Sequence, residues 1–243
     1  MTQNYDQYTS TDQEVWQTLF DRQTHQLPGL ASTAFINGVS DIGFKRDEIP
    51  RFSEINKVLK EKTGWGIYAV PGLIPNRDFF EALKHRLFPA TTWFRKPDQL
   101  DYLEEPDMFH DVFGHVPLLT NQPFCNYLTG LSKIALDHID NDDAIELISR
   151  LYWYTVEFGL IKEPSGLKIY GSGILSSAGE SPFSLSDKPK RVEFSVDDIL
   201  RTPYIKDRFQ EKYWVIQSYD DLYSSVPEIR EKIEALLKTG VRF

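Results

Sequence analysis

Apolar residues recur every three or four positions in six long segments of this chain, which is the spacing of one face of an α-helix. The first segment starts with a capping pair, Thr11 and Glu14, and the last runs from Ser225 to Gly240. A shorter helix is predicted to begin at Ser195, which Asp198 follows in the same capping pattern. The six long helices are predicted at residues 11–26, 53–64, 76–83, 121–137, 141–161 and 225–240.

Four short stretches rich in β-branched and aromatic residues predict strands. They are WGIYAVPGL at 65–73, LKIYGSG at 167–173, KRVEFS at 190–195 and YWVIQ at 213–217. The consecutive helices at 121–137 and 141–161 would form the core, so the predicted fold class is mainly α with small β elements. A chain of 243 residues buries about 70% of the surface that its unfolded form exposes, so we expect one domain over residues 1–243, with residues 1–10 flexible.

Charge, hydropathy and cysteine content argue against nucleic-acid partners, membrane spans and cysteine metal sites. The formal net charge of −9 would repel phosphate backbones, so we expect no nucleic-acid partner. No apolar run approaches the roughly 20 residues that span a bilayer, and the first residues lack the pattern of a secretory signal. We therefore expect a cytoplasmic protein with no membrane partner. The single cysteine, Cys125, excludes an internal disulfide and a multi-cysteine metal site, so any metal has to be held by histidine and carboxylate.

Two histidines stand five residues apart in EPDMFHDVFGHVPLL at 105–119. On a straight α-helix, side chains five apart point about 140° apart around the axis, so His110 and His115 could not face one ion. Gly114 and Pro117 could end the helix here, because glycine permits a left-handed helix end and proline does not continue a helix. His115 could then turn back toward His110. We therefore interpret the two histidines as candidate metal ligands at a helix end.

Glu157 in LYWYTVEFGL is the candidate third ligand. It lies in the most apolar part of its helix, where an unpaired carboxylate is costly to bury. Two imidazoles and one carboxylate are the ligand set of non-haem Fe(II) oxygenases, and Asp107 and Asp111 could tune such a site. The residues alone leave an alternative open, in which the histidines are structural and Glu157 pairs with Arg150.

Three segments together resemble one known family. EPDMFHDVFGHVPLL, LYWYTVEFGL and KIYGSGILSSAGE are similar to the signature segments of the pterin-dependent aromatic amino acid hydroxylases, in the order and separation of that family. The similarity extends more weakly over nearly the whole chain, and it is greatest to the single-domain bacterial members that act on phenylalanine. It implies a single catalytic domain of the aromatic amino acid hydroxylase type, in which His110, His115 and Glu157 match the three iron ligands.

The resemblance also implies where the substrate and the pterin bind. Arg95 matches the arginine that pairs with the substrate carboxylate, and Ser176 would orient His110. Glu180 matches an acidic residue near the iron-bound waters, for which a catalytic role is expected. The substrate-binding positions are Arg95, Pro106, Trp153, Phe158, Gly173 and Ser176, and the pterin-binding positions are Gly72, Leu73, Ile74 and Phe79, where the ring of Phe79 would stack on the pterin.

The activity that the resemblance implies is that of an Fe(II)- and tetrahydropterin-dependent monooxygenase. It would use O2 to hydroxylate the ring of L-phenylalanine to L-tyrosine, so its partner would be a small aromatic amino acid. The alternatives are a tryptophan or tyrosine hydroxylase on the same scaffold, a zinc hydrolase with the same three ligands, and a silent pterin-binding module.

Two positions depart from the pattern of animal members of the family. Leu103 stands where they have a threonine, and Pro89 stands where they have a histidine, which leaves the fine substrate selectivity open. The regulatory domain and the tetramerisation helix of the animal enzymes have no counterpart in the matching region. A monomer is therefore expected.

Overall fold

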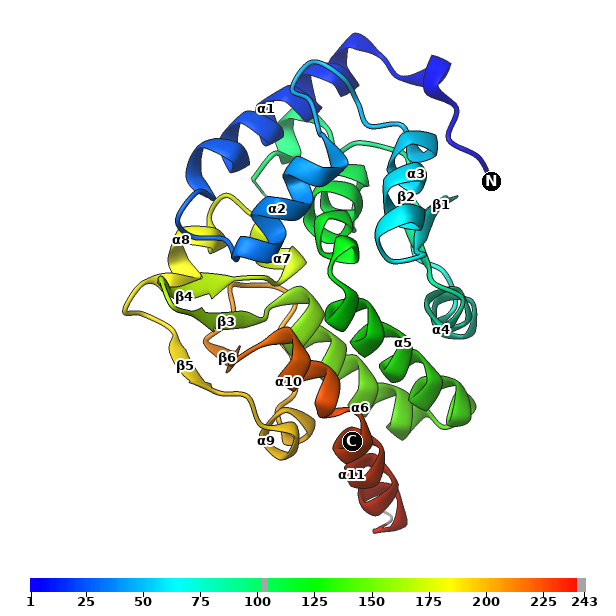
Figure 1. Ribbon diagram of the computed structural model, residues 1–243, viewed down its shortest axis with the longest axis vertical. Coiled ribbons are helices and arrows are strands. Elements are labelled where there is room, and N and C mark those ends of the chain that lie inside the picture. The colour runs from blue at the N-terminus through cyan, green and yellow to red at the C-terminus, as the bar shows by residue number, and fades with distance from the viewer. Residues whose placement is uncertain (102–104, 240–243) are drawn as a thin grey trace.

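The computed structural model describes residues 1–101 and 105–239 of the chain, so Leu103 and Gly240 lie outside the described residues. Most of the described residues are helical, and short strands lie beside the helical core, as Figure 1 shows. This confirms the predicted class, mainly α with small β elements. In the described part of the chain, no helix is both long and apolar enough to cross a bilayer.

Among the described residues, two helical segments are π-helices, η3 (Phe109–His115) and η5 (Trp153–Glu157), and three are short 3-10 helices, η1 (Tyr5–Gln7), η2 (Pro97–Gln99) and η4 (Val116–Thr120). The α-helices are α1 (Ser10–Gln26), α2 (Thr33–Ile42), α3 (Phe52–Lys62), α4 (Asn76–Lys84), α5 (Gln122–Asp137), α6 (Asp142–Tyr152), α7 (Ser172–Leu175), α8 (Glu180–Leu185), α9 (Val196–Arg201), α10 (Tyr219–Ser224) and α11 (Val226–Lys238). The strands are β1 (Gly66–Val70), β2 (Leu87–Thr91), β3 (Leu160–Glu163), β4 (Gly166–Ile169), β5 (Lys190–Glu193) and β6 (Lys212–Ile216).

Helices α5 and α6 pack against each other and run from the middle of the molecule to its edge (Figure 1). Each is capped by an asparagine at the position where the predicted helix starts: the side chain of Asn121 accepts a hydrogen bond from Phe124 N, and that of Asn141 accepts one from Ala144 N. Their apolar faces are almost completely buried, and burial of such faces is the main source of stability for helices in a folded protein. The buried core residues of the two helices include Leu128, Leu131, Ile134, Leu147, Ile148 and Leu151.

The prediction of one helix over residues 141–161 is wrong for the last residues of this range. Helix α6 ends at Tyr152, and η5 continues with a hydrogen bond of 2.9 Å from Phe158 N to Trp153 O, five residues back. The apolar residues that follow form β3, which pairs with β4 and β6. A short run that is buried on both sides has no spacing that distinguishes a strand from a helix, which explains the error.

In the part of the chain that the structure describes, the strands form two sheets. β1 and β2 pair in parallel, with Gly66 opposite Leu87, and α4 connects them. The other sheet has the order β4-β3-β6-β5; β3 and β4 are antiparallel, and β6 is parallel to both of its neighbours. The sequence does not predict β2 because Pro89 interrupts its pattern. The proline is tolerated there because a two-stranded sheet has only edge strands.

Helix α2 is a further element that the sequence does not predict. Its middle contains Asn37 and Gly38, which are both weak helix formers. The reason for the glycine lies elsewhere in the chain: a Cβ at Gly38 would lie 2.1 Å from the carbonyl oxygen of Pro117. The missing side chain therefore lets α2 pack closely against η4, the segment that directly follows the two candidate histidines.

Helix α1 begins earlier than predicted. Its capping box is formed by Thr9 and Asp12, whose side chains bind each other's backbone N–H groups, and not by Thr11 and Glu14. Both pairs have the same spacing and chemistry, so the sequence pattern could not choose between them.

The first ten residues make contacts with the body of the protein. Oη of Tyr5 donates to Ile49 O at 2.9 Å, and the hydroxyl of Tyr8 lies 3.2 Å from Sδ of the buried Met108. The flexibility expected for residues 1–10 stays a prediction. Any movement of this segment would have to break these contacts.

Candidate metal centre

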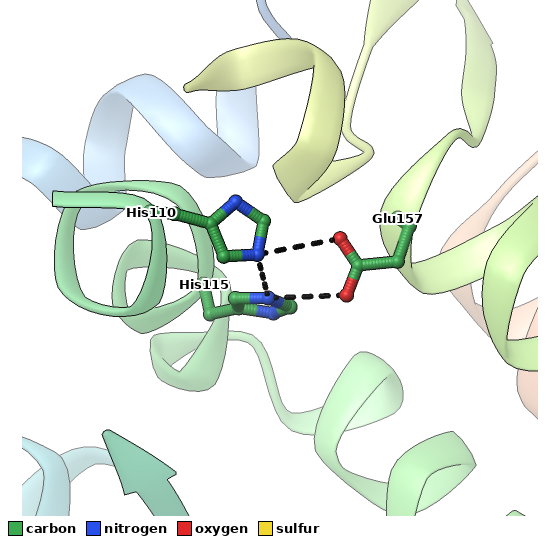
Figure 2. Close-up of side chains that lie close together, drawn as sticks. All are labelled: His110, His115 and Glu157. Atoms are coloured by element: carbon green, nitrogen blue, oxygen red, sulfur yellow. Dashed lines mark hydrogen bonds and ion pairs between the residues drawn. The ribbon is translucent and has the colours of Figure 1, made fainter. Parts of the chain in front are cut away.

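The side chains of His110, His115 and Glu157 converge on one point, as Figure 2 shows. Nε2 of His110 lies 3.1 Å from Nε2 of His115, and oxygens of Glu157 lie 3.6 Å and 3.2 Å from these two nitrogens. Donor atoms bound at right angles to one ion, each about 2.1 Å from it, would be about 3.0 Å apart. The three side chains therefore fit a shared metal ion, and two imidazoles with one carboxylate fit iron.

Both segments that supply these side chains are π-helices, which explains how histidines five residues apart can face the same way. The i→i+5 hydrogen bonding of a π-helix brings His115 roughly one turn above His110. Gly114 does not form the predicted left-handed helix end, because η3 continues through it and its φ is not in the left-handed region. Gly114 instead provides space, since a Cβ there would lie 3.0 Å from Ser172 O.

Hydrogen bonds determine the tautomer of His110. Its Nδ1 lies 2.9 Å from Oγ of Ser176, and this hydroxyl donates to Ser172 O at 2.8 Å. Oγ of Ser176 therefore accepts the proton of Nδ1–H, which leaves the lone pair on Nε2 facing the other two side chains. Burial lowers the pKa of His110 by more than the charge of Glu157 raises it, so the imidazole is neutral, as metal binding requires.

Strand β2 supports η3 through two contacts. The ring of His115 packs against Phe88, with 4.6 Å between the ring centroids. The carboxylate of Asp111, which we expected to tune the site, accepts hydrogen bonds from the backbone N (2.7 Å) and Oγ1 (2.8 Å) of Thr91. Asp111 therefore fixes the position of η3 on the β2 strand, and this holds the ring of His115 in place.

Glu157 is ionised in spite of its burial. Burial raises its pKa, but the interaction with His115 and a 2.8 Å hydrogen bond from Oγ of Ser172 outweigh this and lower the pKa to about 2. Arg150, the alternative partner that we considered, pairs with a glutamate of its own helix at 3.0 Å. Ser172 was missed by the sequence analysis, because it is one of several serines in its segment and no spacing distinguishes it.

Arg95 and Asp107 form a buried ion pair next to η3. Nε and Nη2 of Arg95 bind the two carboxylate oxygens of Asp107 at 2.9 and 2.8 Å. Asp107 also accepts the backbone N–H of His110 at 3.1 Å, so the pair connects Arg95 to the candidate metal ligand. Together with a weaker contact to Leu100 O, the bonds to described residues use three of the five N–H groups of Arg95. The predicted substrate residue Pro106 directly precedes Asp107 and is half-buried.

Aromatic rings surround the predicted substrate position Trp153. Its ring is tilted onto Phe158, with 4.7 Å between centroids, and it stacks on Tyr204 at 5.2 Å. Gly173 keeps Phe158 close to the ligands, because a Cβ there would lie 2.8 Å from the ring of Phe158 and 3.1 Å from Glu157 O. Tyr204, in the loop between α9 and β6, was not identified from the sequence.

The positions expected to bind the pterin lie on one loop and the helix that follows it. They are Gly72, Leu73, Ile74 and Phe79. The loop connects β1 to α4, and Leu73 on it is 77% exposed. The ring of Phe79 contacts Tyr152, with 5.5 Å between centroids, and Tyr152 directly precedes Trp153. The structure therefore brings α4, the helix that follows this loop, to the N-terminal end of η5.

Glu180 is buried, but the hydrogen bonds of its carboxylate are made away from the three converging side chains. Its Oε1 accepts from Oη of Tyr213 at 2.6 Å and from the backbone N of Gln210 at 3.2 Å. Burial raises the pKa of Glu180 by more than these two hydrogen bonds lower it. A catalytic role for Glu180 at the metal stays a prediction.

The sequence matches one family over almost its whole length. The family described as biopterin-dependent aromatic amino acid hydroxylase matches residues 4–240. A phenylalanine-4-hydroxylase of Ralstonia nicotianae is 48% identical over 238 residues, which cover 97% of this chain and 76% of that protein. A phenylalanine-4-hydroxylase of Chromobacterium violaceum is 47% identical over 226 residues, which cover 93% of this chain and 76% of that protein.

Two solved structures of the Chromobacterium violaceum phenylalanine hydroxylase have a similar fold. One contains oxidised Fe(III) and has a TM-score of 0.95 at 44% identity, covering 100% of this chain and 88% of that chain. The other contains iron(III) and the oxidised cofactor 7,8-dihydrobiopterin, and has a TM-score of 0.94 at 44% identity with the same coverage. The similarity therefore includes the segments that carry the three converging side chains.

Proposed function

Because this chain belongs to the biopterin-dependent aromatic amino acid hydroxylases, we propose that it hydroxylates the ring of L-phenylalanine to L-tyrosine, using Fe(II), a tetrahydropterin and O2. The observation that carries the proposal is the convergence of His110, His115 and Glu157 at distances that suit one metal ion. Such a ligand set occupies one face of the ion and leaves positions open on the other.

The direct test is to incubate the purified chain with a tetrahydropterin and O2, adding phenylalanine, tryptophan or tyrosine, and to identify the products by mass spectrometry. We expect tyrosine from phenylalanine at the highest rate, with Fe(II) and not with Zn(II). A higher rate on tryptophan or tyrosine would correct the substrate. Failure to hydroxylate any of the three amino acids with Fe(II) would overturn the proposal.

The positions of the residues indicate which ligand each of them would bind. Bound iron and reduced pterin would together activate dioxygen, one atom of which ends on the substrate ring. We propose that Arg95 binds the substrate carboxylate with its remaining N–H groups, while Trp153, Phe158, Gly173 and Pro106 line the pocket for the ring. Rigid aromatic walls fix the ring and exclude water from the reacting atoms.

We propose that the pterin binds on the loop between β1 and α4, against Gly72, Leu73 and Ile74, with its flat ring stacked on Phe79. The contact of Phe79 with Tyr152 supports this, because it places α4, which follows the loop, next to the start of η5, and η5 supplies Glu157. The pterin and the substrate would then lie close together at the N-terminal end of η5, where Tyr152 contacts Phe79 and Trp153 lines the substrate pocket.

Arg95→Lys should raise the Michaelis constant for phenylalanine well beyond tenfold and change that for the pterin little. Lysine keeps the positive charge but lacks the planar guanidinium group of arginine. That group binds Asp107 and would bind the substrate carboxylate at the same time. Steady-state kinetics with each substrate varied in turn measure both constants. Arg22→Lys, at an exposed ion pair with Asp101, is the matched control. A rise in the constant for the pterin alone would mean that the two pockets are assigned the wrong way round.

We propose that the chain is a monomer in solution with one substrate site. The large apolar side chains that are exposed in the described part of the chain come from separate helices, strands and loops, as is usual on a monomer. They are Met1, Ile36, Leu73, Leu87, Phe209 and Tyr223. Light scattering should give a mass near 28.2 kDa, and the rate should depend hyperbolically on phenylalanine concentration. A stable tetramer with a Hill coefficient clearly above one would contradict this.

We further propose that the protein works in the cytoplasm and has no nucleic-acid partner. Its one cysteine, Cys125, is a buried free thiol, which suits a reducing compartment. The net charge of −9 disfavours contact with phosphate backbones.

A further inference from the structure

The indole of Trp153 is held by the loop that connects α9 to β6, at residues 202–211. Its Nε1–H donates to Oε1 of Gln210 at 3.2 Å, and its ring stacks on Tyr204 of the same loop. Oη of Tyr154, the next residue, donates to Pro203 O at 2.8 Å, which is a second attachment between η5 and the loop. The orientation of the indole therefore depends on a segment that follows Trp153 by about 50 residues and contains none of the candidate metal ligands.

Gln210 is placed so that only one orientation of its amide satisfies both neighbours. Its side chain is almost fully buried, with 2% of the residue exposed. Nε2 donates to Ile205 O at 2.8 Å, and a carbonyl oxygen can only accept. Oε1 is therefore turned toward Trp153, whose indole N–H can only donate. A buried amide that makes both bonds is rigid, because any rotation would leave a polar atom without a partner.

Glu180 holds the backbone of the same residue. Its Oε1 accepts from the backbone N of Gln210 at 3.2 Å and from Oη of Tyr213, on β6, at 2.6 Å. The carboxylate thus fixes the end of the loop to the sheet, and the side chain of Gln210 extends from this fixed point to Trp153. Both residues are less than 10% exposed, so water does not compete for these bonds.

We propose that Gln210 is a positioning residue for the hydroxylation: it fixes the indole of Trp153 as a wall of the pocket for the substrate ring, and Glu180 acts through it. This inference rests on the proposed function, in which Trp153 lines that pocket. Without Gln210 the indole can turn, the pocket loses its shape, and the substrate ring is held less tightly. The hydrogen bonds of Gln210 reach none of the positions proposed for the pterin, so binding of the pterin should change little.

The kinetic test is a double-mutant cycle. Gln210→Leu should raise the Michaelis constant for phenylalanine about three- to tenfold, the range for loss of one neutral hydrogen bond, with little change for the pterin. In a Trp153→Phe background, which has no indole N–H, Gln210→Leu should have no further effect. Glu211→Gln, an exposed neighbour, is the matched control. An equal effect of Gln210→Leu in both backgrounds would overturn the proposal.

A second measurement needs no activity. The chain has five tryptophans, so a ¹H–¹⁵N spectrum of the full-length metal-free protein should show five indole signals, and Trp153→Phe identifies the one from Trp153. Gln210→Leu and Glu180→Ala should both move that signal and speed its exchange with solvent. The signal of Trp16, which donates to Lys45 O, should stay in place.

The spectrum distinguishes the roles of Gln210 and Glu180. A Trp153 signal unmoved by Gln210→Leu would overturn the proposal. If Glu180→Ala lowered the turnover number without moving the signal, Glu180 would act at the metal and not through Gln210. Should Gln210→Leu fail to fold, Gln210→Glu keeps the size of the side chain but has no N–H for Ile205 O, so the hold on the indole changes and its signal should again move from its position in the unaltered chain. If the unaltered chain hydroxylates no aromatic amino acid, the proposed function falls, while the spectrum still shows whether Gln210 holds Trp153.

Discussion

Replacement of His110, His115 or Glu157 by alanine will abolish ring hydroxylation and remove most of the bound iron, while the helices stay folded. Three donors are few for a metal ion that must keep open positions, so the loss of one leaves a site with weak affinity. The fold should survive, because the apolar cores of α5 and α6 do not depend on these side chains. Glu157→Gln should behave like the alanine variant, since the amide keeps the shape but has no charge for the ion.

Iron content by mass spectrometry of the metal, turnover, and far-UV circular dichroism measure the three parts of this result. His85→Ala is the matched control, because His85 is exposed and its partner is the exposed Glu81. It should keep full iron and full activity. A variant of His110, His115 or Glu157 that retained both would not be a ligand, and the set of donors would have to be revised.

Asp107→Ala will destabilise the protein by about 3–5 kcal/mol, which is the range for breaking a buried ion pair by removal of one partner. Asp107 is completely buried and Arg95 is 7% exposed, so the variant leaves the guanidinium charge in the interior without its counter-ion. Burial alone would raise the pKa of Asp107, but the hydrogen bonds and charge of Arg95 outweigh it and lower the pKa, which shows that the folded state favours the ionised pair. The backbone N–H of His110 also loses its acceptor.

Urea denaturation of the metal-free variant and the unaltered chain at pH 7 measures this loss. Asp101→Ala removes the partner of Arg22 in an exposed pair, so it should change the unfolding midpoint little. Replacing both members of the buried pair, with Arg95→Met added to Asp107→Ala, should restore part of the stability, because no unpaired charge remains. If Asp107→Ala unfolded at the same urea concentration as Asp101→Ala, the buried pair would not be the support for η3 that we infer.

Local chemistry explains which parts of this structure could be predicted from the sequence. The caps at Asn121 and Asn141 involve residues three positions apart, so the starts of α5 and α6 follow from the sequence directly. The three converging side chains could be selected because histidine and a carboxylate in apolar surroundings are unusual. These features need no knowledge of the rest of the fold.

The parts that could not be predicted depend on contacts between distant segments. Ser172 reaches Glu157 from 15 residues away, and Gln210 reaches Trp153 from 57 residues away, so no local pattern marks either residue. Helix α2 contains Gly38, which has to lack a side chain because the carbonyl of Pro117, far along the chain, lies against it. In each case the residue type has many ordinary uses, and only the tertiary structure shows which one applies.

The two π-helices have a consequence for how this chain can change in length. A π-helix is rare and has poorer backbone geometry than an α-helix, so deletion of one residue from η3 or η5 would let the backbone relax into the more favourable form. The same deletion would turn every later side chain of that segment by about 100° and disperse the donors. Stability of the backbone therefore favours the shorter α-helical form of these two segments, whereas metal binding requires the π-helical form. The spacing of five between the histidines thus brings both onto one ion at the cost of a less favourable backbone.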